Sequence, residues 1–139
     1  MYKTVLIILM LAPLVIFSQN ETDSKGRKQG EWSKKWENGK TRYKGQFKDD
    51  KPYGKFLYWY DTGEPQTSLT YSANGKEAFC KTYSKNGKIA AKGKYVDQKK
   101  DSTWSYYDEK GRLRAKNNYS HGALDGEQVT YDWQGKLME

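Results

Sequence analysis

Residues 30–39 read GEWSKKWENG, and a similar aromatic run ending in glycine recurs four more times along the 139-residue chain. The closing glycines follow one another at intervals of 24 residues: Gly39, Gly63, Gly87, Gly111 and Gly135. Two further ladders keep the same interval: Gly30, Gly54, Ala78, Ser102 and Gly126 upstream, and Phe47, Tyr71, Tyr95 and Tyr119 downstream. Because three ladders stay in phase, the protein is a tandem repeat.

Each repeat predicts two strands joined by a tight turn. Asn38-Gly39 and Asn86-Gly87 are strong hairpin signals, because this turn needs the positive φ that Asn and Gly tolerate. After the first turn, residues 41–47 alternate between an apolar and a basic side, which is the pattern of a half-buried strand. The sequence therefore predicts an all-β fold: an elongated antiparallel meander of about five β-hairpin units, with roughly nine strands in a single open twisted sheet.

The first strand of each unit is harder to place in register. Phe79 and Tyr83 stand at alternation positions opposite to those of the rings in the first two units, and Leu57 and Trp59 put bulky groups on both sides. Two explanations remain open. Either β-bulges redirect these strands, or some of the rings are exposed.

The N-terminus has the pattern of a secretory signal peptide over residues 1–18. Lys3 precedes an apolar run from Thr4 to Phe17, which is too short to span a bilayer comfortably. An uncleaved anchor is the alternative. Residues 19–29 form a polar segment that either caps one edge of the sheet or is disordered, and residues 30–139 form the repeat domain. We expect a secreted, periplasmic or cell-envelope protein. The single Cys80 lies far from the leader, so no lipoprotein cysteine is available.

The composition predicts a thin, aromatic core and a preference for anionic partners. Aromatic residues outnumber Leu, Ile and Val after residue 18, and the chain carries a net charge of +8. One cysteine in an exported protein excludes an internal disulfide.

The units resemble MORN repeats, specifically the variant that is common in bacterial proteins. The resemblance rests on the aromatic strand, the Asn-Gly-Lys turn and the following glycine and ring, seen in residues 30–47 and 86–95. It covers about residues 29–139. The third unit departs from the pattern, with Ala78 and Cys80 where a glycine and an aromatic residue are expected.

This resemblance implies an elongated β-sheet that serves as an interaction platform. Some relatives are linked with membrane phospholipids, and some bacterial relatives are labelled antitoxins of toxin–antitoxin systems. Because the fold is shared by many roles, the resemblance points to a class of function and not to one partner.

No catalytic, cofactor or metal site is expected, and we predict that the chain is not an enzyme. The only histidine, His121, falls in a predicted loop without partner residues, and Cys80 is interpreted as a small half-buried apolar residue. Asp49, Asp50 and Asp61 fall in loops, where they are typical turn formers.

The best candidate binding surface is a basic stripe beside exposed rings. The stripe combines cations from the second strands of three units: Arg42, Lys44, Lys92, Lys94, Arg114 and Lys116. Tyr58 and Trp59 of the second unit are the candidate rings. A binding surface for an anionic group is one interpretation, and ordinary solvated lysines that discourage edge-to-edge aggregation are the other.

These features predict an exported, non-enzymatic scaffold that mediates protein–protein interaction through its sheet, with a partner that the sequence does not name. Two alternatives are a peripheral membrane module that binds anionic phospholipid and an antitoxin or immunity-like protein. An acidic glycan is a further ligand class. Nucleic acid is disfavoured by the expected export.

Overall fold

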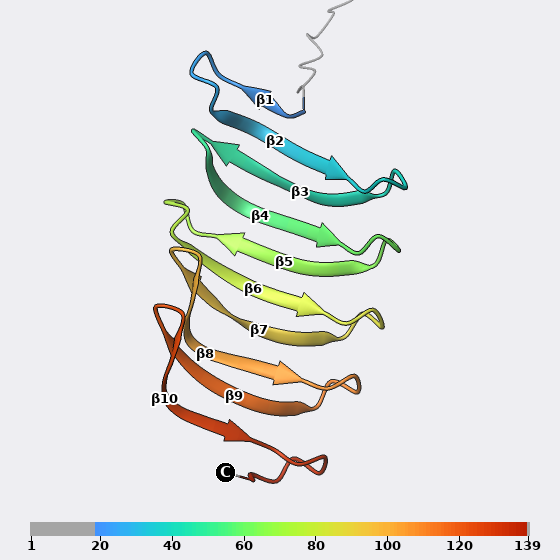
Figure 1. The fold of residues 1–139 in the computed structure, drawn as a ribbon, viewed down its shortest axis with the longest axis vertical. Helices are drawn as coiled ribbons and strands as arrows, with labels where there is room; N and C mark the ends of the chain where they lie inside the picture. Colours follow the sequence, from blue (N-terminus) through green and yellow to red (C-terminus); the bar gives the residue numbers. More distant parts are fainter. Residues whose placement is uncertain (1–18, 139) are drawn as a thin grey trace, which may run out of the picture.

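The computed structural model describes residues 19–138, which form ten strands in one sheet (Figure 1). The strands are β1 (Glu21–Thr22), β2 (Lys28–Lys35), β3 (Thr41–Lys48), β4 (Lys51–Trp59), β5 (Pro65–Tyr71), β6 (Glu77–Tyr83), β7 (Ile89–Val96), β8 (Lys99–Tyr107), β9 (Leu113–Ser120) and β10 (Ala123–Thr130). Every strand is antiparallel to the next, in sequence order. The predicted fold class is confirmed. The predicted signal peptide lies outside the described residues.

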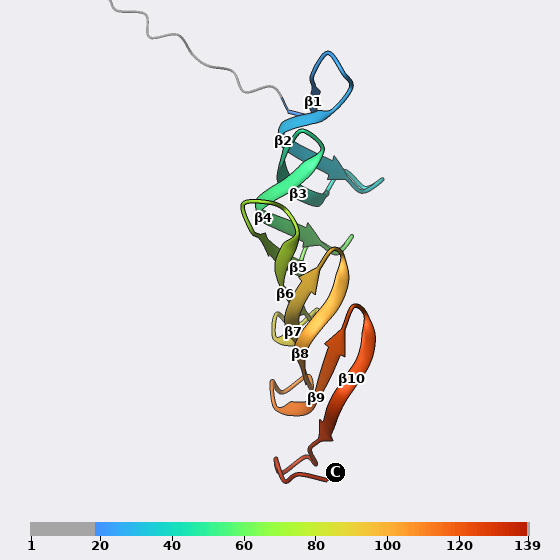
Figure 2. The ribbon, with the colours of Figure 1, turned by 90° about the vertical axis from the view of Figure 1, so that its left-hand side faces the viewer.

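The sheet is a single elongated and twisted layer. The strands follow one another along its long axis, and within residues 19–138 no second layer covers either face (Figure 2). The polar N-terminal segment contributes β1, which pairs with the start of β2 through Glu21–Gln29 and Thr22–Lys28 and so caps that edge. The described residues contain no helix that is long and apolar enough to cross a membrane.

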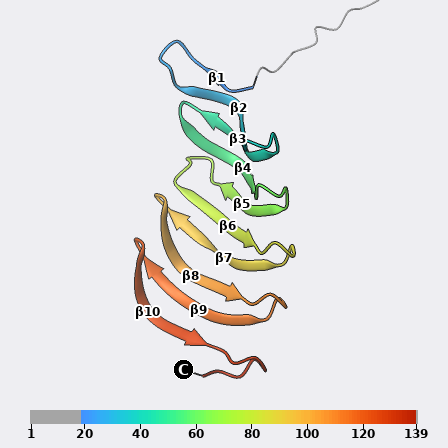
Figure 3. The same ribbon diagram turned by 45° about the vertical axis from the view of Figure 1, so that its right-hand side comes forward.

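The turns that close the hairpins, which include Asn38-Gly39 and Asn86-Gly87, form a column along one side of the sheet (Figure 3). In the first turn the Gly39 amide donates to the Trp36 carbonyl at 3.0 Å, and Gly39 has a φ of 82° that suits glycine. The Asn38 amide group also donates to the Asp61 carbonyl of the next turn at 2.7 Å. Asn86 repeats this contact with the Glu109 carbonyl at 2.9 Å. The turns therefore connect neighbouring hairpins as well as closing them.

Bulges in β4 and β8 let a ring lie on a glycine of the preceding strand. Between the pairs Lys44–Leu57 and Gln46–Tyr53, the single residue Gly45 faces residues 54–56. The ring of Phe56 then covers Gly45 so closely that a Cβ on this glycine would lie 2.3 Å from the ring carbons. The β-bulges that the sequence left open as one explanation are therefore present in β4 and β8.

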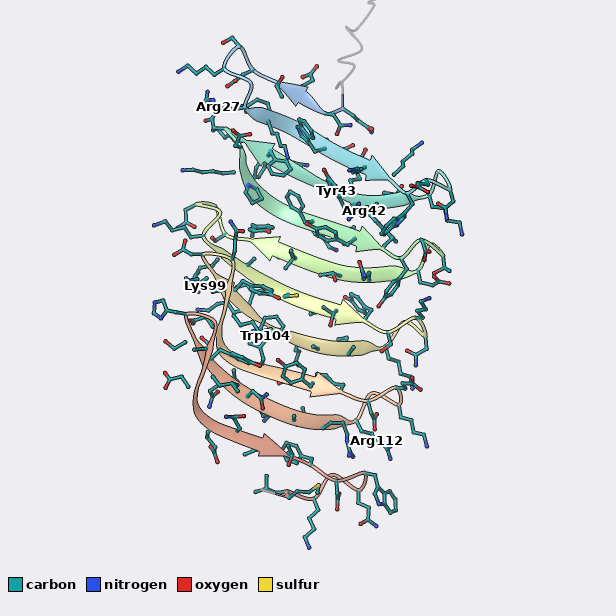
Figure 4. The ribbon with its side chains drawn as sticks, viewed as in Figure 1. Arg27, Arg42, Tyr43, Lys99, Trp104 and Arg112 are labelled. Carbon is teal, nitrogen blue, oxygen red and sulfur yellow. The ribbon has the colours of Figure 1, made fainter. Side chains whose placement is uncertain are left out.

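Trp104 repeats this arrangement in the fourth unit. Gly93 faces residues 102–104, and a Cβ on Gly93 would again lie 2.3 Å from the Trp104 ring. Trp104 is 2% exposed and lies across the sheet where β7 and β8 are neighbours (Figure 4). Its indole nitrogen donates to the Lys94 carbonyl at 3.0 Å. We call the side of the sheet that carries Phe56 and Trp104 the ring face, and the opposite side the basic face.

The third unit lacks the bulge. β5 and β6 pair without a register shift, so Leu69 stands directly opposite Cys80. In β4 and β8 the bulge accommodates two extra residues. In the third unit these two residues lie in a longer turn between β5 and β6, where the Ser72 amide donates to the Glu77 carbonyl. The other connections between units are two-residue turns such as Asp49-Asp50. A Leu–Cys pair thus replaces a Gly–aromatic pair, while the period stays at 24 residues.

Edge-to-face ring pairs run along the ring face and form its thin core. Phe56 lies 5.2 Å from Phe47 and 5.3 Å from Tyr71 between ring centroids, with interplanar angles of 90° and 74°. Tyr95 and Trp104 are 4.9 Å apart at 74°. This is the geometry that aromatic quadrupoles favour. The expectation of a thin aromatic core is confirmed for the described residues.

We expect Gly93→Ala to destabilise the fold by about 1–3 kcal/mol, because the added methyl would displace the Trp104 ring. Gly93 does not have a positive φ, so backbone strain is not the cause. Urea denaturation would measure the loss. In a Trp104→Leu background the same change should cost less. An equal cost in both backgrounds would contradict the proposed contact.

Candidate binding faces of the sheet

The six predicted cations lie on one face of the sheet. One row of cross-strand partners runs across nine strands: Ser33, Lys44, Leu57, Ser68, Lys81, Lys92, Ser105, Lys116 and Val129. Arg42, Lys94 and Arg114 stand two residues from members of this row, so they share its face. The structure thus brings the basic stripe together on the basic face.

Only one of the two predicted rings shares the face of the cations: Trp59 stands two residues after Leu57 of this row, whereas Tyr58 lies on the opposite face. Tyr58 belongs to the neighbouring row on the ring face, where its centroid lies 5.8 Å from that of Tyr43. Burial raises the pKa of the Tyr58 hydroxyl above its usual range. Trp59 ends β4 opposite Pro65, where the register shifts, and is half-buried. Its carbonyl accepts a hydrogen bond from the Trp36 indole at 3.1 Å.

Several cations of the stripe already have partners within the chain. Lys44 forms an ion pair with Glu31 at 3.0 Å, and Lys94 forms one with Glu77 at 3.3 Å. The Arg42 guanidinium lies 4.6 Å from the centre of the Trp36 ring. These contacts satisfy much of the charge at the first unit. Arg42, Lys44 and Lys94 are therefore less available to a ligand than the other cations of the stripe.

The unpaired positive charge gathers around a hollow on the basic face between β4 and β9. Five lysines line this hollow, of which Lys94 is paired with Glu77 and the other four are Lys55, Lys81, Lys92 and Lys116. All four are exposed, and none forms an ion pair within residues 19–138. Hydroxyl groups of Ser68, Thr70, Thr103 and Ser105 lie between them, in a volume of about 810 Å³. We call the four lysines, with Phe79, the lysine cluster.

Phe79 supplies an exposed ring to the lysine cluster. It is 64% exposed and lines the hollow, on the same strand and face as Lys81. Sequence reasoning noted that Phe79 departs from the alternation of the other rings but did not select it, and it did not select Lys55 or Lys81. The signal was available: Phe79 is adjacent to Cys80, which stands at the core ring position of the repeat, and alternation along a strand puts neighbouring residues on opposite faces.

The residues with potential for catalysis or metal binding are scattered. Within residues 19–138 no three His, Cys, Asp or Glu side chains are grouped as a metal site would require. His121 is exposed in the turn between β9 and β10, and its Nδ1 lies 3.0 Å from the Ser120 hydroxyl. Cys80 is 3% exposed, and burial raises the pKa of its thiol to about 11.

The Cys80 thiol should therefore react slowly with disulfide reagents in the folded protein. At pH 8 a thiol with a pKa of about 11 is almost entirely protonated, and the thiolate is the reactive form. We expect little reaction with 5,5′-dithiobis(2-nitrobenzoate) in buffer and one thiol per chain in 6 M guanidinium chloride. Rapid stoichiometric reaction of the folded chain at pH 8 would contradict this burial.

Comparison with known families agrees with the repeat geometry. The MORN repeat variant matches residues 28–49, which include β2 and β3, and residues 80–97, which include most of the third hairpin. No curated protein matches the chain at a significant level. MORN repeats generally act as scaffolds for interaction with proteins or membranes, and they are not an enzymatic kind of repeat. The chain thus contains MORN repeat variant units at residues 28–49 and 80–97, and the same hairpin geometry is repeated between and beyond them.

Proposed function

We propose that the chain is an exported, non-enzymatic scaffold that binds an acidic protein partner through the lysine cluster on its basic face. One observation carries the proposal: Lys55, Lys81, Lys92 and Lys116 surround one hollow, without a neutralising carboxylate among the described residues. Phe79 gives the same surface an apolar contact. Charge complementarity of this kind favours encounter and selects the partner.

The spacing of the cluster suits a folded surface or an extended segment with several carboxylates. Lys81, Lys92 and Lys116 belong to one cross-strand row on β6, β7 and β9. Since neighbouring strands are about 4.8 Å apart, Lys81 and Lys116 are separated by roughly 14 Å. A segment that crosses the strands could place carboxylates at both ends of this row and an apolar side chain against Phe79.

The proposed site of action follows from the leader. The charged start, apolar middle and polar end of residues 1–20 support export. The partner would then be an envelope or extracellular protein. Nucleic acid stays a disfavoured partner for the same reason.

Neutralising the lysine cluster should abolish capture of the partner. The variant Lys55→Gln/Lys81→Gln/Lys92→Gln/Lys116→Gln and the parent chain, both from Gln19 onward, would serve as bait in envelope extract of the source organism. We expect one acidic protein to be retained by the parent chain, in about stoichiometric amount, and at least 10-fold less by the variant. The attraction is screened by salt, so the retained amount should fall between 50 and 500 mM NaCl.

The matched control changes the same number of charges elsewhere. Lys25, Lys34, Lys110 and Lys136 are exposed and lie outside the hollow, so their replacement by Gln lowers the net charge equally. This control should retain the partner. Equal loss in both quadruple variants would show that net charge alone is responsible and would refute the lysine cluster as the site.

An anionic membrane surface is the second candidate, and the exposure of Phe79 is the observation that favours it. Aromatic rings beside lysines are suited to the headgroup region of a bilayer, where each lysine near an anionic surface contributes about 1 kcal/mol.

Vesicle flotation would distinguish the membrane candidate from the protein candidate. With vesicles of 30% phosphatidylglycerol and 70% phosphatidylcholine, the membrane candidate predicts binding that Phe79→Ser weakens about 10-fold and that the lysine variant abolishes. Vesicles of phosphatidylcholine alone are the control. If the anionic vesicles retain no protein at 50 mM NaCl, the membrane candidate is excluded and the protein candidate stands.

A further inference from the structure

The ring face is interrupted at β6. This strand presents only small side chains to that face, namely Ala78, Cys80 and Thr82. The corresponding residues one unit earlier are Gly54, Phe56 and Tyr58, and one unit later they are Ser102, Trp104 and Tyr106. Two aromatic rings of the repeat are thus missing from one strand, side by side.

A hollow of about 430 Å³ lies over the missing rings. Its walls are formed by the rings of Tyr58, Tyr71 and Tyr95, and its floor by Leu69, Cys80 and Thr82. This volume is in the range of pockets that bind small molecules. The hollow lies on the opposite face from the lysine cluster and depends on none of the lysines discussed there.

The first and fourth units carry a lysine at the entry to this position, whereas the second and fifth units carry Pro52 and Leu124 there. In the first unit the Lys28 ammonium lies 4.9 Å from the centre of the Trp32 ring, which follows it by four residues. In the fourth unit the Lys100 ammonium lies 4.6 Å from the centre of the Trp104 ring, again four residues later. Each lysine therefore makes a cation–π contact with the core ring of its own unit.

Lys76 stands at the same repeat position in the third unit and lacks such a ring. The residue four places later is Cys80, and Lys76 lines the end of the hollow. Within the described residues its ammonium has no ion pair and no ring contact. The hollow thus combines an absent ring with an unpaired cation that elsewhere contacts that ring.

The tyrosine walls add hydrogen-bond donors. The hydroxyls of Tyr58, Tyr71 and Tyr95 form no hydrogen bond with other described residues. Burial raises the pKa of each of these hydroxyls, so all three are protonated at neutral pH. A ligand with an apolar body and an anionic group would meet both kinds of partner here.

We propose that the hollow over β6 binds a small aromatic carboxylic acid. Its ring would lie between Tyr71 and Tyr95, as Phe56 lies between Phe47 and Tyr71, and its carboxylate would pair with Lys76. The unpaired Lys76 ammonium favours a ligand with a carboxylate. The lysine–ring contacts of the first and fourth units favour a ligand whose apolar part is an aromatic ring. The proposal is independent of the partner of the basic face.

Indole-3-acetate is the probe, and indole is its uncharged counterpart. Titration of the ¹⁵N-labelled protein should give saturable amide shifts in β5, β6 and β7, with a dissociation constant of roughly 0.1–1 mM. Lys76→Gln should weaken indole-3-acetate about 5-fold and leave indole unchanged. If both probes bind the parent chain equally, the hollow does not select an acid, and the proposal fails.

A filling variant tests the place of binding. Thr82→Tyr copies Tyr58 and Tyr106 at the same repeat position, so it should fold, and its amide spectrum would verify this. We expect it to lose binding at least 10-fold. Lys110→Gln, in an exposed turn outside both hollows, is the control and should bind as the parent does. Unchanged binding in Thr82→Tyr, or no saturable shift up to about 10 mM probe, would overturn the proposal.

Discussion

The contact between an aromatic ring and a glycine on the neighbouring strand is the constraint on which this sheet depends. A single layer has no second sheet or helix to exclude water from its backbone, so the protein uses its own rings. Phe56 covers Gly45 and Trp104 covers Gly93, and a Cβ on either glycine would occupy the space of the ring. The two-residue bulges in β4 and β8 bring these rings over the glycines. The glycine ladder, the bulges and the buried rings are therefore parts of one packing arrangement.

The sequence was sufficient to predict the strands but not which of the rings pack onto a glycine. Fixed glycine spacing and Asn-Gly turns locate hairpins through local conformational preference, so the meander could be predicted. Whether a strand carries a bulge depends on cross-strand contacts outside any single unit, so the sequence did not reveal these ring–glycine contacts. Phe79 shows the limit of aligning the repeats by residue type. It stands next to the core ring position of its unit, so alternation along β6 places it on the basic face beside Lys81.

The same reasoning explains why the candidate site was predicted only in part. The strand alternation placed the six cations on one face, as the structure does, because alternation is a property of each strand alone. The contacts of Lys44 with Glu31 and of Lys94 with Glu77 involve neighbouring strands, so the sequence did not reveal that these charges are satisfied. The unpaired lysines gather where the third unit is irregular. Both hollows, one on each face, therefore include residues of the irregular third unit.

The unbulged third unit also distinguishes one hairpin from another. Identical repeats can fold out of order, since any hairpin could pair with the unit after next and leave one out. Leu69 stands opposite the small Cys80, whereas Trp104 requires a glycine opposite its ring. If β5 paired with β8 in place of β6, Leu69 would occupy the space that the indole needs. The Leu69–Cys80 pair therefore disfavours a misfolded sheet in which β5 pairs with β8 and leaves out the third hairpin.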